Sequence, residues 1–286
     1  MNMRKPEEIR KLEESLVDYA GEDRVVTSHE LAQQLEDLPE FTYNTGIKAI
    51  DRILGGVQPG EMIIVSGPTG EGKTTLLMTI TNLMAQANIP SLWFTLEVTP
   101  RAFIQKIKKG AGDLMPTFYL PNRNTDNQLE WLEQRIIEAK VKYDPKVVFI
   151  DHVHQIFSLH KVKSGSLSLE IGDMVGKIKQ MAIDHHLVIF LIAHTRDNSE
   201  KPNAEPRKEE IRDSGLISRL ADAIILVWRV KNAEAEKDKR PANLDENDTF
   251  SKVRIVKNRR EGKMGTFLMN HENGLLHELD DDAFGA

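Results

Sequence analysis

Cysteine is absent from this 286-residue sequence, and so is any run approaching about 18 apolar residues. Without thiols the chain forms neither disulfides nor thiolate metal sites, which fits a cytoplasmic protein, either cellular or of a phage in its host. Its first residues, MNMRKPEEIRKLEE, lack the apolar core of a signal peptide. We therefore expect no transmembrane helix and no membrane partner.

An excess of positive charge is also lacking. The chain has 38 Lys and Arg against 44 Asp and Glu, a net charge of −6. This balance gives no overall attraction to nucleic acid and argues against a nonspecific DNA-coating protein. It leaves room for a ring that holds DNA in a narrow channel lined by a few basic loops.

The sequence pattern of residues 1–40 predicts a helical N-terminal arm. Apolar residues at helical spacing predict an amphipathic helix over 4–20. Thr27 and Glu30 resemble a capping box at the start of a second helix, 28–37.

Residues 41–286 predict one α/β domain, because strand-like and helix-like segments alternate as a parallel sheet with crossover helices requires. Buried strands are expected at 61–66, 91–97, 146–151, 187–194 and 222–230, and helices at 74–87, 100–110, 126–142 and 167–186. Strands at 252–258 and 265–270 predict an antiparallel hairpin at the sheet edge. The expected fold is a mostly parallel twisted sheet flanked by helices, with this hairpin at its C-terminal end.

The stretch SGPTGEGKTTLL, residues 66–77, fits the phosphate-binding loop pattern G-x-x-x-x-G-K-T at every specified position. Glycines let backbone N–H groups converge on a phosphate, and the helix that follows adds its positive end. Lys73 is expected to reach the β and γ phosphates, and the Thr74 hydroxyl to ligate Mg²⁺. The predicted ATP-binding residues are Gly67, Pro68, Thr69, Gly70, Glu71, Gly72, Lys73, Thr74 and Thr75. An ordinary glycine-rich turn is the alternative, and the flanking strand and helix argue against it.

Three polar residues close strand-like runs at the edge where ligands of parallel sheets bind. Asp151 is expected on the Mg²⁺ side of the nucleotide, with helix capping as the alternative. Glu97 is expected to orient an attacking water, or else is a solvated acid. His194 is expected to sense the γ-phosphate, or else is a satisfied histidine at the sheet end.

Two further motifs remain open. His152 and His154 alternate in register and could suggest a metal pair, but we expect no third ligand nearby and therefore no metal site there. Lys257, Arg259 and Arg260 lie at the turn of the late hairpin and suit an arginine finger acting across a subunit boundary. A basic hairpin tip in solvent is the alternative.

Together these stretches resemble the RecA-like motor domain of hexameric replicative DNA helicases, which include the DnaB type, phage primase-helicases and Twinkle. The resemblance covers about residues 43–278. It is carried by GPTGEGKTT, FTLE, FIDHVH, LIAHTRD, EIRDSGLISRLADAIILVWR and VKNRREGKMGT. The IDH and AH variants look closest to the phage and Twinkle branch. Only about 40 residues precede the motor, where such helicases commonly carry a primase or primase-binding domain. A minimal helicase and a fragment of a longer chain both remain open.

The resemblance implies ATP and Mg²⁺ as cofactors and a role for each matched residue. It makes Glu97 the catalytic base and His194 the γ-phosphate sensor, and it places Lys73 and Thr74 on phosphate and Mg²⁺ with Asp151 as the metal-side acid. It also implies that Lys257 and Arg259 are supplied in trans to a neighbour's ATP.

For partners, the resemblance implies a homo-oligomer, a hexameric ring, that grips single-stranded DNA. The helix over 28–37 resembles a linker helix that docks on the adjacent subunit. The candidate DNA-gripping residues are Lys161, Lys163, Arg196, Lys201, Arg207 and Lys208. A primase or a helicase loader is a further partner that the family implies.

The sequence leaves three functions open. The first is an ATP-driven DNA helicase acting in replication. The second is a RecA/RadA/KaiC-like ATPase that acts in recombination or as a regulatory ring without unwinding. The third is a phosphate-loop kinase, for which no acceptor site or lid is found in the sequence.

Overall fold

The protein divides into two compact units, Met1–Phe41 and Thr42–Ala286. The computed structural model describes residues 5–21, 24–36, 41–111, 115–124, 129–152, 156, 167–195, 205–211, 214–230 and 250–279.

The small unit contains two helices, α1 (Pro6–Leu16) and α2 (Ser28–Glu36). The backbone N–H of Glu30 donates to Thr27 Oγ1 at 3.1 Å, which is the predicted cap at the start of α2. The Glu30 carboxylate accepts from Arg24 at 3.1 Å. No residue of α1 is buried, so the apolar face of this amphipathic helix stays exposed.

The large unit alternates strands and helices. Its strands are β1 (Met62–Gly67), β2 (Ser91–Thr95), β3 (Val147–Asp151), β4 (Val188–His194), β5 (Ala223–Val230), β6 (Phe250–Asn258), β7 (Gly265–Glu272) and β8 (Leu275–Glu278). Its helices are α3 (Lys48–Leu54), α4 (Lys73–Gln86), α5 (Pro100–Ala111), α6 (Leu129–Tyr143), α8 (Leu167–Asp184), the 3₁₀ turn η1 (Lys208–Glu210) and α9 (Ser214–Leu220).

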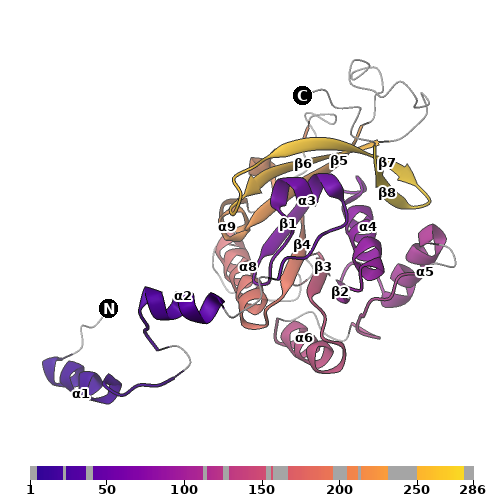
Figure 1. Ribbon diagram of the computed structural model, residues 1–286. Coiled ribbons are helices and arrows are strands. Elements are labelled where there is room, and N and C mark those ends of the chain that lie inside the picture. The colour runs from indigo at the N-terminus through magenta and orange to yellow at the C-terminus, as the bar shows by residue number, and fades with distance from the viewer. Residues whose placement is uncertain are drawn as a thin grey trace. The chain divides into compact units, whose positions relative to one another are not determined.

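One sheet contains all eight of these strands, in the order β2-β3-β4-β1-β5-β6-β7-β8 (Figure 1). The first five are parallel, and β6, β7 and β8 continue the sheet antiparallel. The predicted fold class is confirmed, with one correction. The hairpin of β6 and β7 is not the edge of the sheet, because β8 pairs with β7 and forms that edge. β8 has four residues, too few for an alternating pattern to show in the sequence.

Helices cover both faces of the sheet because alternate strand residues are apolar on both sides. Met62 and Ile64 of β1 join a core with α6, α8 and α9. Ile63 and Val65 join a second core with α3, α4 and α5 on the opposite face (Figure 1). The burial fixes the register of β1 and with it the position of the loop that follows.

The short helices α3 and α9 were not predicted from the sequence. At seven residues each, they complete too few turns to show a clear helical period. α3 is fixed from a distant part of the chain, because the Glu278 carboxylate accepts from the backbone N–H groups of Lys48 (2.8 Å) and Ala49 (2.6 Å).

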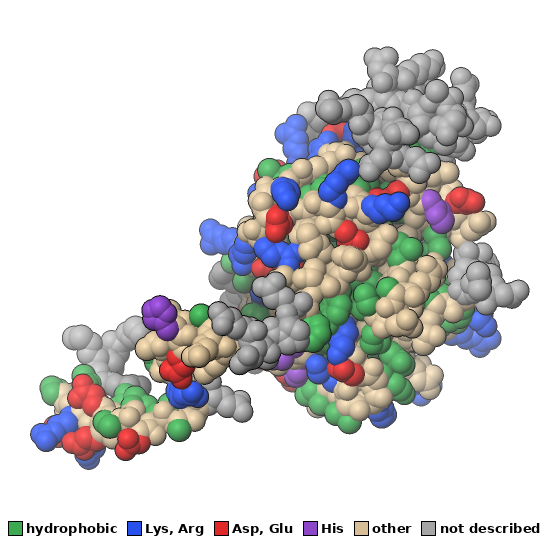
Figure 2. Space-filling view, viewed as in Figure 1, with side chains coloured by type: hydrophobic (Ala, Val, Ile, Leu, Met, Phe, Trp, Pro, Cys, Tyr) green, Lys and Arg blue, Asp and Glu red, His purple; other side chains and the backbone are tan. Residues whose placement is uncertain are grey.

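None of the described helices combines the length and apolar character needed to cross a bilayer. Figure 2 shows Lys and Arg side chains interspersed with Asp and Glu on the drawn face of the large unit. Any attraction of DNA to this face therefore has to come from local groups.

Candidate active site

The predicted phosphate loop joins β1 to α4. Gly72, just before the first residue of α4, has a φ of 107°, which lets the backbone turn sharply into the helix. The Lys73 ammonium is buried and donates to the carbonyl oxygens of Gly67 (2.8 Å) and Pro68 (2.7 Å). Burial lowers the pKa of Lys73 to about 8, while the carboxylate of Asp151 acts in the opposite direction. A phosphate group would supply the negative charge that favours the protonated amine.

Strand β5 supports this loop from beside β1. A Cβ on Gly67, whose φ is 151°, would lie 2.0 Å from the carbonyl oxygen of Val227. The Glu71 carboxylate accepts from the backbone N–H of Arg229 at 2.7 Å. The loop is therefore shaped by the carboxyl end of a strand that is distant in the sequence, a contact that the sequence pattern does not reveal.

Gly67→Ala is expected to lower the free energy of unfolding by at least about 2 kcal/mol, because the new methyl group meets fixed backbone and the φ angle is strained. Gly215→Ala is the matched control. A Cβ there meets nothing within 4 Å and replaces a helical glycine, so stability should stay equal or rise by up to about 1 kcal/mol. Urea unfolding midpoints measure both, and equal midpoints would contradict the contact with Val227.

Thr74 and Asp151 meet at the carboxyl edge of the sheet. The Thr74 hydroxyl donates to Asp151 Oδ2 at 2.7 Å. Burial raises the pKa of Asp151, and the hydrogen bond from Thr74 opposes that rise. A hydroxyl and a carboxylate held this close are the oxygen donors that Mg²⁺ prefers, so the residues fit the ion that the sequence implies.

Glu97, His152 and His194 also come together at this edge. His152 Nδ1 lies 3.3 Å from Glu97 Oε2, and the rings of His152 and His194 meet edge to face with centroids 4.2 Å apart. His152 is buried, whereas Glu97 is exposed. The expectation that no third metal ligand lies near His152 is wrong. Strands that are neighbours in the sheet bring Glu97 and His194 to it, while His154 lies outside the described residues.

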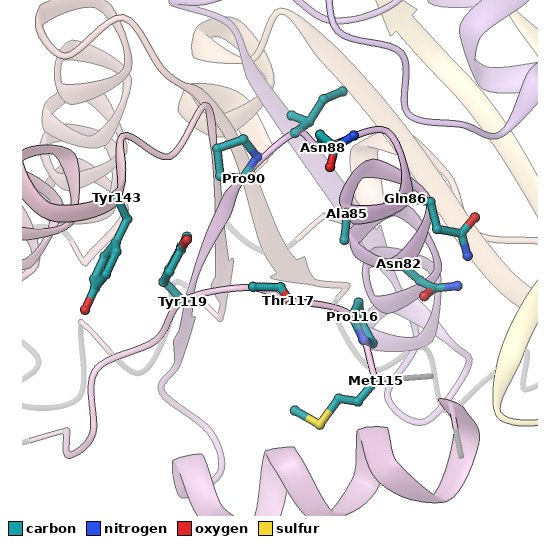
Figure 3. Close-up of a pocket in the computed structure, with 11 residues that line it drawn as sticks. Asn82, Ala85, Gln86, Asn88, Pro90, Met115, Pro116, Thr117, Tyr119 and Tyr143 are labelled. Carbon is teal, nitrogen blue, oxygen red and sulfur yellow. The ribbon is translucent and has the colours of Figure 1, made fainter. Parts of the chain in front are cut away.

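A separate hollow of about 710 Å³ is lined by the C-terminal half of α4, the residues that lead from it into β2, residues 115–117, Tyr119 and Tyr143 (Figure 3). Its lining includes Asn82, Gln86, Tyr119 and Tyr143, and none of its side chains is charged. The phosphate loop is at the other end of α4, whose 14 residues span about 21 Å. This hollow is therefore not the triphosphate site.

The three cations of the late hairpin, Lys257, Arg259 and Arg260, differ in their hydrogen-bond partners and in their exposure to solvent. Lys257 is in β6, where its ammonium donates to the carbonyl oxygens of Ser218 (2.6 Å), Arg219 and Ala221 and so caps the end of α9. Arg260 donates to the carbonyl oxygens of Leu54 (2.6 Å) and Gly56 (2.7 Å) and caps the end of α3.

Arg259 is the most exposed of these three cations, with 57% of its side chain accessible. Its guanidinium donates to the carbonyl oxygen of Arg219 (2.7 Å) and to Asp222 Oδ1 (3.3 Å). Asp222 also accepts from Lys179 and from the backbone N–H of Met62 (2.8 Å), the first residue of β1. Arg259 therefore lies at the amino edge of the parallel strands, opposite the edge that carries the phosphate loop.

Of the candidate DNA-gripping residues, Lys161, Lys163, Arg196 and Lys201 lie outside the described residues. Arg207 and Lys208 are described, and Arg207 is exposed. Glu205 ties their segment to the sheet by pairing with Lys252 and Arg254 of β6.

Residues 43–115 and 108–277 match the family described as DnaB-like helicase C terminal domain. The DNA repair protein RadA of Escherichia coli (strain K12) is 31% identical over 191 residues, which are 65% of the chain and 39% of RadA. The replicative DNA helicase DnaB of Mycoplasma genitalium is 22% identical over 258 residues, covering 79% of the chain and 54% of DnaB. A solved structure of a DnaB-like replicative helicase superposes with a TM-score of 0.70 at 17% identity, covering 96% of this chain and 72% of that one.

The chain thus spans between 39% and 54% of the length of the two relatives RadA and DnaB. The family match covers most of the chain, and it coincides with the sheet, the loop and the strand-end residues described above. This protein belongs to the DnaB-like helicase C-terminal domain family.

Proposed function

We propose that the protein is the ATP-hydrolysing motor of a DNA helicase, which assembles into a ring and moves along single-stranded DNA in replication. The observation that carries this proposal is the separation of the groups that an ATP site needs. The phosphate loop follows the end of β1, whereas Arg259 lies beside its start. Six strand residues span about 17 Å, farther than an arginine side chain extends.

One copy therefore holds an incomplete site at each edge. A second copy whose Arg259 edge faces the first copy's loop would complete the site, and repetition of that contact generates a ring when the rotation closes. Arg259 suits this role because its own side chain is 57% exposed, so that its 3.3 Å ion pair with Asp222 is worth about 0–1 kcal/mol and is easily exchanged. Lys257 and Arg260 suit it less well, because the side chain of each is less exposed than that of Arg259 and donates to several carbonyl oxygens of its own chain, where the guanidinium of Arg259 donates to one.

Within one copy, the loop backbone and Lys73 are proposed to bind the phosphates, and Thr74 with Asp151 to hold Mg²⁺. When bound, Mg²⁺ neutralises phosphate charge. Glu97 is proposed to accept the proton of the attacking water, and His194 to sense the γ-phosphate.

Glu97→Gln is expected to keep ATP binding and to slow hydrolysis by at least about 10²-fold, because an amide cannot accept the proton. Steady-state phosphate release and the binding of a fluorescent ATP analogue measure the two effects. Glu133→Gln, which changes a half-exposed glutamate of α6, is the control and should leave both unchanged. Near-normal hydrolysis in Glu97→Gln would assign the base elsewhere.

Deleting residues 1–40 is expected to weaken assembly. The helix α2, which matches the predicted docking helix over 28–37, has its apolar residue Leu31 exposed and available to a neighbouring copy, while the large unit keeps its own cores. Sedimentation with Mg²⁺ and nucleotide, at several protein concentrations, measures the oligomer. An unchanged oligomer would mean that the arm takes no part in assembly.

A second function has its own support, since RadA is named a DNA repair protein and is 31% identical to the matched part of the chain. ATPase measured with and without single-stranded DNA, together with unwinding of a forked duplex, separates the two. DNA-stimulated hydrolysis with unwinding supports the replicative motor. Hydrolysis without unwinding supports the RecA/RadA/KaiC-like ATPase and would overturn the proposal.

A further inference from the structure

Three potential metal ligands meet where β2, β3 and β4 end. Glu97, His152 and His194 each offer one ligand atom, and these atoms all lie within 4.8 Å of one another. The His152 Nδ1 to Glu97 Oε2 distance is 3.3 Å. Ligand atoms around a tetrahedral Zn²⁺ are roughly 3.3–3.5 Å apart, which follows from bond lengths of about 2.0–2.2 Å. One pair already has this spacing, and side-chain shifts of at most about 1.5 Å would bring the third atom from within 4.8 Å to this spacing.

The donor set distinguishes this cluster from the proposed Mg²⁺ position. Two imidazoles and one carboxylate suit Zn²⁺, Co²⁺ or Ni²⁺, whereas Mg²⁺ prefers oxygen ligands alone. Thr74 and Asp151 supply only oxygen atoms. The chain has no cysteine, so no thiolate elsewhere competes for a softer ion.

The ligands of this cluster differ in burial, with the His152 ring held in the protein interior and the Glu97 carboxylate reaching solvent. His152 is buried and its ring contacts that of His194, which limits how far either ring turns. Glu97 has 46% of its side chain exposed and is free to close on an ion. The exposed side leaves room for water as a further ligand, as in zinc sites with three protein ligands.

We propose that Glu97, His152 and His194 form a binding site for a transition-metal dication of the Zn²⁺ class. This site lies next to the Mg²⁺ position, since His152 Nδ1 is 4.0 Å from Asp151 Oδ1, but it uses a different donor set. Occupancy of this site stops ATP hydrolysis, because a carboxylate that ligates the metal cannot accept a proton from water. This inhibitory consequence rests on the proposed function of Glu97, whereas the binding site itself does not.

The experiment titrates the full chain, without nucleotide and in millimolar Mg²⁺, with Zn²⁺ in a calorimeter. Co²⁺ serves as a spectroscopic probe. The excess Mg²⁺ occupies oxygen-only sites. We expect one Zn²⁺ per chain and a four- or five-coordinate Co²⁺ spectrum that Zn²⁺ abolishes. Glu97→Gln and His194→Gln should each weaken Zn²⁺ binding by at least about 100-fold, since even the loss of outer-shell partners costs about 10- to 100-fold.

His185→Gln is the matched control, because His185 also lies near a glutamate, with Glu133 at 3.5 Å, but outside the cluster. It should bind Zn²⁺ as the unaltered chain does. Circular dichroism checks that the variants fold. Glu97→Gln is expected to fold normally because the Glu97 side chain is exposed, so the test does not depend on the histidine variant alone. The site is overturned if both cluster variants bind Zn²⁺ normally, or if only His185→Gln loses binding.

The activity arm separates the two halves of the proposal. Micromolar Zn²⁺ should inhibit hydrolysis of Mg²⁺-ATP, and a chelator should restore it. Stoichiometric Zn²⁺ binding without inhibition would overturn the inhibitory role and leave the site standing. If the chain has no ATPase activity at all, the proposed function fails while the calorimetric result still decides the site.

Discussion

Arg259→Ala is expected to fold, bind ATP and assemble, yet to hydrolyse ATP about 10³ to 10⁵ times more slowly. The reason is that its guanidinium, at the amino edge of the sheet, is proposed to stabilise charge on the ATP of a neighbouring copy. Folding should survive, because the pair with Asp222 is exposed on the Arg259 side and contributes little. Phosphate release, nucleotide binding and sedimentation measure the three properties.

The control is Lys263→Ala, which removes another exposed cation from the same turn and should leave hydrolysis unchanged. A mixing experiment tests the action in trans. Lys73→Ala chains keep the arginine and Arg259→Ala chains keep the loop, so a mixed boundary can unite the two intact halves. ATPase activity should partly recover on mixing. Little unwinding is expected, because the other subunit boundaries of the ring still lack either Lys73 or Arg259. No recovery in demonstrated mixed rings would mean that Arg259 acts within its own chain or only structurally.

Lys73→Ala is expected to lower both nucleotide affinity and turnover, with hydrolysis falling by about 10³-fold or more. A single neutral donor to developing charge is already worth about 10² to 10³. Lys73 supplies a full positive charge in a buried position. Phosphate release at saturating and limiting ATP separates the effect on turnover from the effect on binding.

The free energy of unfolding of Lys73→Ala distinguishes a role of Lys73 in catalysis from a role in holding the phosphate loop together. Burial lowers the pKa of Lys73, which means that the folded chain without nucleotide holds the ammonium at a cost. That cost offsets the hydrogen bonds of Lys73 to the carbonyl oxygens of Gly67 and Pro68, so Lys73→Ala should change the free energy of unfolding by less than about 2 kcal/mol. Lys106→Ala, on the exposed face of α5, should be as stable as the unaltered chain and retain activity. A large loss of stability in Lys73→Ala would instead assign the lysine to holding the loop together.

The sequence predicted those features that depend on neighbouring residues. The loop from Gly67 to Thr74, the strands before Asp151 and His194, and the cap of Thr27 all follow from short-range patterns. Burial on both faces of a parallel sheet produces long apolar runs, and these runs are plain to read.

Features that depend on topology were not predictable in the same way. Lys257 caps the end of α9 although it lies 36 to 39 residues away from its acceptors in the sequence. Glu278 caps the start of α3 from a position 230 residues away from Lys48. The cluster at His152 requires the strand order, because its partners come from two neighbouring strands. No local pattern encodes these meetings, which arise only when the sheet has formed.

Asp222 is a shared hydrogen-bond acceptor at the amino edge of the parallel strands. One carboxylate joins the guanidinium of Arg259, the ammonium of Lys179 in α8 and the first backbone N–H of β1. Because Asp222 keeps Lys179 and the backbone N–H of Met62 as partners, the departure of Arg259 leaves no bare buried carboxylate behind. The start of β1 therefore stays held whether or not Arg259 is bound to Asp222, and Arg259 is the replaceable member of this group of donors.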